Sequence, residues 1–264
     1  MIILLPPSET KRDGGDHGST LDWSRLSFPA LTEHRQAVAA RLTQLTGDPE
    51  AARRALGLST TQQFEVERNR TFEFAPVMSA LKRYTGVLFD GLDAPSMTPA
   101  ERSFAHKVLV VHSALFGPVA AGDLIPAYRL SHNSRLPGMT LKSHWRQSVT
   151  DALASVEGLQ LDLRSEAYAQ LGAASPNSIY LRVVNEAPDG KRVALSHFNK
   201  KSKGLFSRAL INAGIEHSTV ESLMAWARGA GFRLEHGAPG ELDLVVPNAG
   251  LERRSQTRVW NVGV

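Results

Sequence analysis

The chain of 264 residues contains no cysteine. This absence excludes thiol catalysis, zinc sites with cysteine ligands and redox sensing by a thiol within the chain. Long apolar segments are missing too. The opening run Met1–Leu5 ends at Pro6, whereas a membrane span needs about 20 apolar residues. We therefore predict a cytoplasmic protein that does not enter a membrane, and the opening run is typical of a buried strand.

Motifs of several common catalytic sites are also missing. The chain has no GxxxxGK[ST] phosphate loop, no dinucleotide-binding GxGxxG and no GxSxG nucleophile elbow. Its nine histidines form neither an HxxxH nor an HExxH pattern. The sequence therefore predicts no metal site and no bound cofactor.

The charged residues leave the chain mildly basic, with a net charge of +4. This charge is compatible with a polyanionic partner, but its meaning depends on where the cations lie. A chain of this length can bury a sizeable core in one piece, so we predict a single domain over residues 1–264.

Apolar periodicity predicts a mixed α/β or α+β fold. Residues 141–156 have the spacing of an amphipathic helix, and Thr98–Glu101 forms a capping box that begins another. The apolar run 108–115 is either a buried strand or a continuation of that second helix. Late antiparallel hairpins are expected between 178–185 and 192–198, around Asp189–Gly190, and between 232–235 and 241–246.

Two candidate binding residues lie at the edges of predicted elements. Lys11 follows the opening strand with Ser8 and Thr10, and functional side chains often gather on loops at strand ends. A plain surface turn is the alternative. Lys142 stands at the start of the helix over 141–156, where a cation is mildly unfavourable and suggests an anion nearby. An exposed lysine tolerates that position equally well.

The segment 115–130 contains a glycine turn between apolar stretches. Phe116, Gly117 and Gly122 would form the turn of a helix-hairpin-helix element, whose N–H groups hold a DNA phosphate without reading sequence. Arg129 follows this turn and could support the contact. A buried turn explains the same residues, and the pattern alone leaves both interpretations open.

The most informative stretch is strongly basic. Lys200, Lys201 and Lys203 are expected to precede a helix over 205–211, and Arg208 follows one turn inside it. Lysines beside the N–H groups of a helix start form a natural phosphate site. A solvated basic loop is the alternative interpretation.

These stretches together resemble the YaaA family of peroxide-stress proteins, in the same order and at comparable spacing. The strongest family signature is a run of the type Lys-Lys-x-(Lys/Arg)-Gly-x-(Met/Phe)-(Ser/Ala)-Arg. The matching segments here are Leu5–Lys11, Ala114–Gly117, Asp123–Leu130, His144–Trp145, Arg164–Tyr168, Lys200–Arg208 and Gly240–Leu242. The resemblance covers about residues 1–246.

The resemblance implies a YaaA-type α/β fold with a helix-hairpin-helix-like element, and a protein that binds DNA under oxidative stress. Non-sequence-specific contacts with double-stranded DNA would come from one positively charged cleft, lined by Lys11, Arg129, Lys142, Lys200, Lys201, Lys203 and Arg208. The alternative is an enzyme that acts on a nucleotide or phosphorylated small molecule in that cleft. Ser165 and Glu166 are then candidate catalytic residues, with Glu166 as the acid/base. In a third interpretation the basic residues are only solvated surface.

Overall fold

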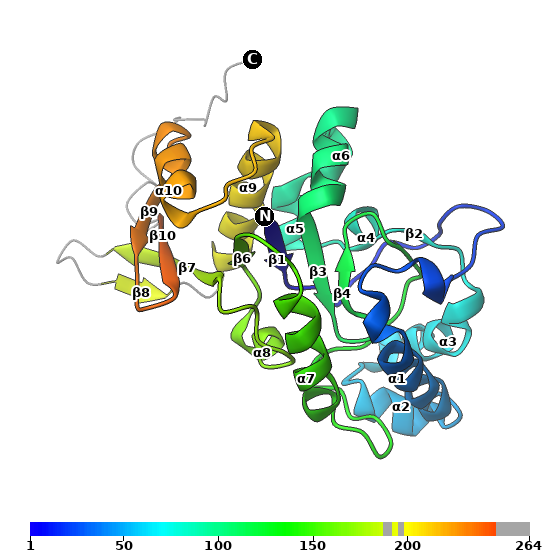
Figure 1. The fold of residues 1–264 in the computed structure, drawn as a ribbon. Helices are drawn as coiled ribbons and strands as arrows, with labels where there is room; N and C mark the ends of the chain where they lie inside the picture. Colours follow the sequence, from blue (N-terminus) through cyan, green and yellow to red (C-terminus); the bar gives the residue numbers. More distant parts are fainter. Residues whose placement is uncertain (187–191, 195–197, 247–264) are drawn as a thin grey trace.

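A mixed β-sheet, with the first segment of the chain in its interior, forms the centre of the fold (Figure 1). The computed structural model describes residues 1–186, 192–194 and 198–246. The strands of this sheet are β1 (Ile2–Leu5), β3 (Leu109–Ser113), β4 (Gly117–Ala120), β6 (Gln160–Asp162), β7 (Ser178–Glu186), β8 (Arg192–Ala194), β9 (Arg233–His236) and β10 (Glu241–Val246). A small separate sheet pairs β2 (Met78–Ser79) with β5 (Leu124–Ile125).

The strand order is β4–β3–β1–β6–β7–β10–β9, with β8 pairing to β7. The pairs β1–β3, β1–β6, β6–β7 and β7–β10 are parallel, whereas β4, β8 and β9 run antiparallel to their neighbours. All four residues of β1 are buried, as expected for a parallel strand that is covered on both faces.

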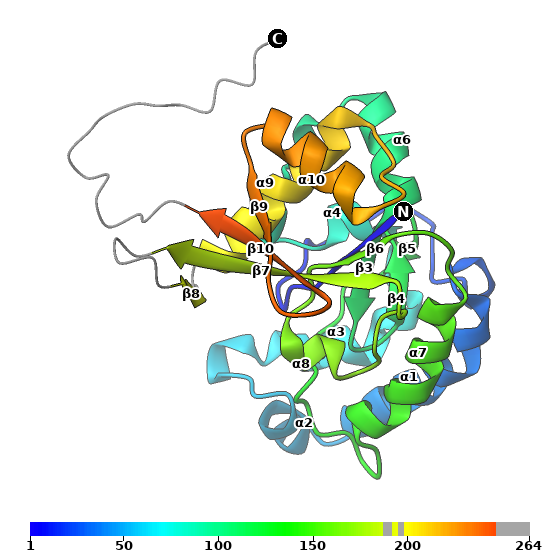
Figure 2. The same cartoon turned by 60° about the vertical axis from the view of Figure 1, so that its left-hand side comes forward.

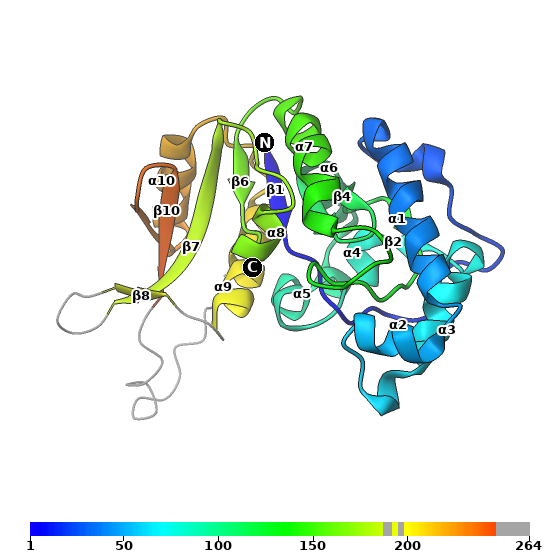
Figure 3. The ribbon, with the colours of Figure 1, turned by 90° about the horizontal axis from the view of Figure 1, so that it is seen from below.

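Helices form the other two layers. The α-helices are α1 (Thr32–Leu45), α2 (Pro49–Ala55), α3 (Phe64–Thr71), α4 (Ala80–Arg83), α5 (Val87–Leu92), α6 (Pro99–Val108), α7 (Leu141–Ala154), α8 (Glu166–Ala169), α9 (Phe198–Ala213) and α10 (Val220–Gly229). Short 3-10 helices are η1 (Trp23–Arg25), η2 (Pro29–Leu31), η3 (Thr60–Gln62), η4 (Phe72–Phe74) and η5 (Ala94–Ser96). Figure 2 shows α6, α9 and α10 on one face of the sheet and α1 and α7 on the other. Figure 3 shows α1, α2 and α3 together at the far end from β10.

The sequence-based prediction of a mixed α/β fold with late antiparallel hairpins is confirmed. Strand β7 pairs with β8, and β9 pairs with β10. The expected turn at Asp189–Gly190 lies outside the described residues. The second hairpin strand was expected to reach Phe198, but Phe198 is already the first residue of α9.

The apolar run after the capping box is a strand. Thr98 Oγ1 accepts a hydrogen bond from the Glu101 N–H at 3.2 Å, and the Glu101 carboxylate accepts one from the Thr98 N–H at 2.7 Å. This box begins α6, which ends at Val108, and β3 follows at once. Pairing with β1 therefore decides between the two conformations that periodicity left open.

The helix-hairpin-helix prediction for the segment 115–130 is wrong at these residues. Strands β3 and β4 flank the turn instead of helices, and Phe116 is fully buried. The N–H groups of Leu115 and Phe116 already donate to Ser113 Oγ, at 3.0 and 2.9 Å. Trp145 Nε1 donates to the carbonyl of Ala114 at 2.9 Å. These groups are thus paired within the protein, and the buried turn is the correct interpretation.

The basic stretch also lies differently from its prediction. Helix α9 begins at Phe198, so Lys200, Lys201 and Lys203 are part of the helix and do not precede it. Tertiary packing extends the helix backwards, because α9 lies tightly against α5 through glycines. A Cβ at Gly204 would be 2.1 Å from the Leu88 carbonyl oxygen, and this close approach excludes any side chain there.

We predict that Gly204→Ala lowers the free energy of unfolding by about 1–3 kcal/mol, because the added methyl forces α9 away from α5. Gly229→Ala is the matched control. Gly229 is also helical, but a Cβ there meets no atom within 4 Å, so the change should be neutral or stabilising by up to about 1 kcal/mol. Urea unfolding of both variants checks this, and equal stabilities would contradict the tight α5–α9 contact.

Candidate functional site at the carboxyl ends of the parallel strands

Three loops meet at one edge of the sheet because β1, β3 and β6 are parallel neighbours. The loop 6–11 follows β1, the turn 114–116 follows β3 and the segment 163–165 follows β6. Ligands of open α/β sheets characteristically bind outside this carboxyl edge. The polar side chains that gather here form two groups, which we call the Lys11 cluster and the Arg164 cluster.

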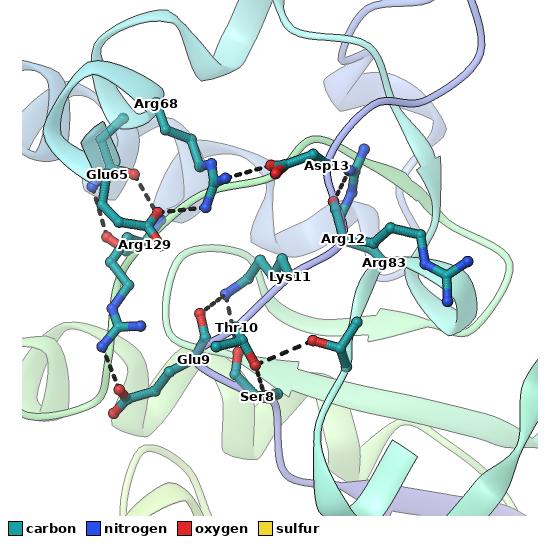
Figure 4. A network of polar contacts seen from close by, with 12 residues as sticks. Ser8, Glu9, Thr10, Lys11, Arg12, Asp13, Glu65, Arg68, Arg83 and Arg129 are labelled. Atoms are coloured by element: carbon teal, nitrogen blue, oxygen red, sulfur yellow. Dashed lines mark hydrogen bonds and ion pairs between the residues drawn. The ribbon is translucent and has the colours of Figure 1, made fainter. Parts of the chain in front are cut away.

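The Lys11 cluster is built around a buried amine. Lys11 is only 8% exposed, and its Nζ donates to the carbonyl oxygens of Ser8 at 3.0 Å and Glu9 at 3.2 Å. The same nitrogen lies 4.0 Å from the ring centre of Tyr128. Figure 4 shows the side chain turned toward the carbonyls of its own loop. Lys11 is therefore held by dipoles and a ring face, and the neighbouring Glu9 carboxylate pairs with Arg129 instead.

This environment changes the acidity of Lys11. Burial, followed by the positive charge of Arg129, lowers the pKa of Lys11 from its ordinary 10.5 to about 7. The amine is then close to half-protonated near neutral pH. Lysines with such values are typical of sites that bind anions reversibly, move protons or attack an electrophile.

A chain of three buried hydroxyl groups adjoins Lys11. Tyr128 Oη lies 2.8 Å from Tyr84 Oη and 2.6 Å from Ser113 Oγ. Burial raises the pKa of Tyr84 to about 12 and that of Tyr128 well above its usual value, so both phenols stay protonated. These three hydroxyl groups therefore form a continuous hydrogen-bonded path from the end of β3 to the Lys11 cluster.

Acidic and basic side chains surround Lys11. Arg129, 7% exposed, pairs with Glu9, and its main-chain N–H and carbonyl both bond to the Asn69 amide at 2.7 Å. Arg68 pairs with Glu65 at 2.6 Å and also with the exposed Asp13. Figure 4 shows these pairs around Lys11. The two arginines are thus matched by carboxylates, whereas the Lys11 amine is bonded to main-chain carbonyls.

The Arg164 cluster follows β6. Asp162 holds the Arg164 guanidinium through two bonds, from Nε at 2.9 Å and from Nη2 at 2.7 Å. Lys203, which is 4% exposed, reaches this segment from α9 and donates to the carbonyl of Leu163 at 3.0 Å. Burial lowers the pKa of Lys203 from 10.5 to about 8. A second buried lysine is thus bound to main-chain carbonyls, just beyond the end of a central strand.

The remaining predicted site residues lie nearer the surface. Lys142 is exposed, donates to Gln170 at 2.9 Å and, with Arg146, lines a hollow of about 450 Å³ at the start of α7. Lys200 and Lys201 are exposed in the first turn of α9, whereas Arg208 pairs with Glu101 at 3.5 Å. Ser165 and Glu166 are exposed at the start of α8. Lys11 and Arg129 thus share one cluster and Lys203 belongs to the other, whereas Lys142 is exposed on α7 and both Lys200 and Lys201 are exposed on α9.

Several residues of these clusters were not singled out from the sequence. Tyr84, His112 and Asp162 are the main examples. His112 is the next-to-last residue of β3 and Asp162 is the last residue of β6, in Val110-Val-His-Ser113 and Leu161-Asp-Leu-Arg164. A polar residue at the end of a buried strand is a signal that could have indicated them. Tyr84 carries no comparable local signal.

Among the described residues, no group of three or more His, Asp and Glu side chains is arranged to hold a metal ion. No helix within residues 1–186 and 198–246 combines the length and apolar character needed to cross a membrane.

The low pKa of Lys11 predicts a pH-dependent contribution to stability. Between pH 7 and about 10 the unfolded chain keeps the Lys11 proton while the folded protein loses it, so the stability of the wild type relative to Lys11→Met should rise with pH. The slope approaches about 1.4 kcal/mol per pH unit. Urea unfolding at pH 7, 8 and 9 measures this difference.

Lys82→Met serves as the control for this measurement, because Lys82 is exposed. Its stability difference from the wild type should stay constant over the same pH range. Lys203 makes the same pH-dependent contribution to the stability of the wild type and both variants, so this contribution cancels in the differences. A constant difference for Lys11→Met as well would show that Lys11 keeps its ordinary pKa.

Comparison with known proteins places the chain in a family. Residues 1–237 match the family described as "Peroxide stress protein YaaA". The UPF0246 protein CE1889 of Corynebacterium efficiens is 44% identical over 253 residues, covering 93% of this chain and all of the relative. The UPF0246 protein SCO2297 of Streptomyces coelicolor is 40% identical over 249 residues, covering 91% and 94%. The chain therefore belongs to the YaaA family of peroxide stress proteins.

Proposed function

We propose that the chain serves the peroxide-stress role of its family as an enzyme that binds a nucleotide or phosphorylated small molecule at the carboxyl edge of the sheet. The observation that carries this proposal is Lys11. Its amine is buried, donates to two main-chain carbonyls and has a pKa of about 7. Keeping a lysine in such a place costs stability, and functional sites commonly retain groups of this kind.

The chemistry of Lys11 suits a phosphoryl ligand. When charged, the amine can bind a phosphate oxygen; when neutral, it can accept a proton or act as a nucleophile. The hydroxyl chain of Tyr84, Tyr128 and Ser113 lies beside it as a route for protons. Glu166, exposed at the start of α8, remains the candidate acid/base that the sequence suggested.

We expect ligand binding to be coupled to proton uptake. A bound phosphate favours the charged form of Lys11 and raises its pKa, so the complex should take up protons at pH 7.5. A thermal-shift screen of nucleotides and sugar phosphates identifies a ligand. Calorimetry of that ligand in buffers of different ionisation enthalpy then counts the protons.

Lys11→Met should lose both the binding and the proton uptake, while Lys82→Met, on the exposed surface, should retain both. The affinity of the wild type should fall as the pH rises from 7 to 9. The proposal would be contradicted by ligands that stabilise Lys11→Met as much as the wild type, or by a screen in which no phosphorylated compound stabilises the wild type.

DNA binding is a second candidate function, favoured by a different observation. Lys200 and Lys201 are exposed in the first turn of the 16-residue α9, and Lys142 and Arg146 line the hollow at the start of α7. Helix starts with adjacent cations suit phosphate contacts that do not depend on sequence. Buried Lys11, Arg129 and Lys203 would contribute little to such a surface.

If these helices bind DNA, the neutral variant Lys200→Gln/Lys201→Gln should bind a labelled duplex more weakly and with a smaller salt dependence. Losing two phosphate contacts reduces the slope of log K against log salt by about 1.8. Lys82→Gln/Arg41→Gln, which changes two exposed cations elsewhere, is the control. Fluorescence anisotropy at several salt concentrations measures the slope, and no wild-type binding at low salt would eliminate this function.

A further inference from the structure

His112 in β3 has one ring nitrogen whose protonation is set by its partner. The residue is fully buried, and its Nδ1 lies 2.8 Å from Nη1 of Arg164. A guanidinium can only donate hydrogen bonds, so Nδ1 must carry a lone pair. The imidazole is then neutral and carries its proton on Nε2. Burial, followed by the charge of Arg164, holds the pKa of His112 well below its usual value, in agreement with this geometry.

The Arg164 side chain is held in place by several hydrogen bonds, so it keeps His112 in this tautomer. Asp162 binds its Nε and Nη2, and the same Nη1 that contacts His112 also donates to the Gly172 carbonyl at 2.9 Å. Both carboxylate and guanidinium are buried, so breaking the arrangement would leave unpaired charge inside the protein. The Arg164 cluster therefore fixes both the orientation and the tautomer of His112.

The Nε2–H of His112 has no hydrogen-bond partner among the described residues. An unpaired buried donor costs about 1–3 kcal/mol, so native proteins keep few of them, and a ligand or an ordered water accounts for some. Nε2 of His106 and of His217 are also unpaired there. Their neighbours Lys107 and Glu216 form a pair, and Glu216 also lies 3.6 Å from the Met1 amino group, at the amino edge of the sheet. Of the three, only His112 lies near the carboxyl edge.

We propose that His112 binds the ligand of the proposed function by donating its Nε2–H to a phosphoryl oxygen. Tyr168 packs beside His112: the two ring centres lie 6.0 Å apart, and burial raises the pKa of Tyr168. Because His112 is fully buried, neighbouring side chains have to move before a ligand can reach the imidazole. A neutral donor holds the oxygen without giving up its proton, which leaves proton transfer to Lys11. This inference rests on the proposed function.

Two variants separate the two nitrogens of His112. In His112→Asn the side-chain oxygen can replace Nδ1 as the acceptor for Arg164, but the donor at the Nε2 position is lost. In His112→Gln the longer side chain can place an N–H near the Nε2 position. With inorganic phosphate as the probe, we expect His112→Asn to melt close to the wild type and to bind about tenfold more weakly. His112→Gln should bind more tightly than His112→Asn.

Nitrogen NMR of histidine-labelled protein adds a readout that a merely structural role would not change. His112 should remain the Nε2–H tautomer from pH 5.5 to 8, and its Nε2–H proton should move downfield when phosphate is added. A protonated ring at pH 7, an Nε2–H signal indifferent to bound phosphate, or wild-type affinity in His112→Asn would each overturn the inference. If the wild type binds neither phosphate nor any compound of the nucleotide screen, the proposed function itself fails. If Lys11→Met loses binding while His112→Asn keeps it, only the role of His112 fails.

Discussion

The parallel pairing of β1 with β3 on one side and β6 on the other is the interaction on which the rest of the structure depends. Parallel neighbours end at the same edge of a sheet, so residues after position 5, position 113 and position 162 meet there. All side chains of β1 are buried, and helices cover both faces of the sheet. Without this strand no covalent or local constraint would bring Lys11 near Tyr128.

Four buried cations, Lys11, Lys203, Arg35 and Arg83, donate their hydrogen bonds to main-chain carbonyls. Arg35 donates to the carbonyls of Phe116 and Pro118, and Arg83 to those of Ile125 and Pro76. These bonds connect α1 and α4 to the strands. Hydrogen bonds to carbonyl dipoles offset only part of the free energy that a charged group loses when it leaves water. A buried arginine stays protonated in these surroundings, while a buried lysine approaches neutrality. Burial of cations against main-chain carbonyls thus holds the scaffold together and also lowers the pKa values of Lys11 and Lys203.

Membership of a peroxide-stress family, in a chain without cysteine, constrains how the protein can take part in the stress response. Oxidation of its own thiols is excluded. Acid–base and nucleophilic groups on its other side chains remain available. The carboxyl edge of the sheet concentrates such groups in buried positions, whereas the exposed lysines among the described residues are distributed over α4, α6, α7 and α9. The buried titratable side chains at this edge therefore characterise the protein more clearly than its mild net charge does.

Local sequence patterns were sufficient for what depends on neighbouring residues. The capping box of Thr98 and Glu101, the opening strand, the mixed fold with late hairpins and the family itself could all be inferred in this way. Tertiary structure alone decided which cations are buried, because burial depends on segments far apart in the chain. His112 and Arg164 meet across 52 residues, and the turn after Ser113 is closed by Trp145. Local patterns do not encode long-range packing of this kind, so only the assembled sheet could reveal a neutral histidine and two buried lysines at its edge.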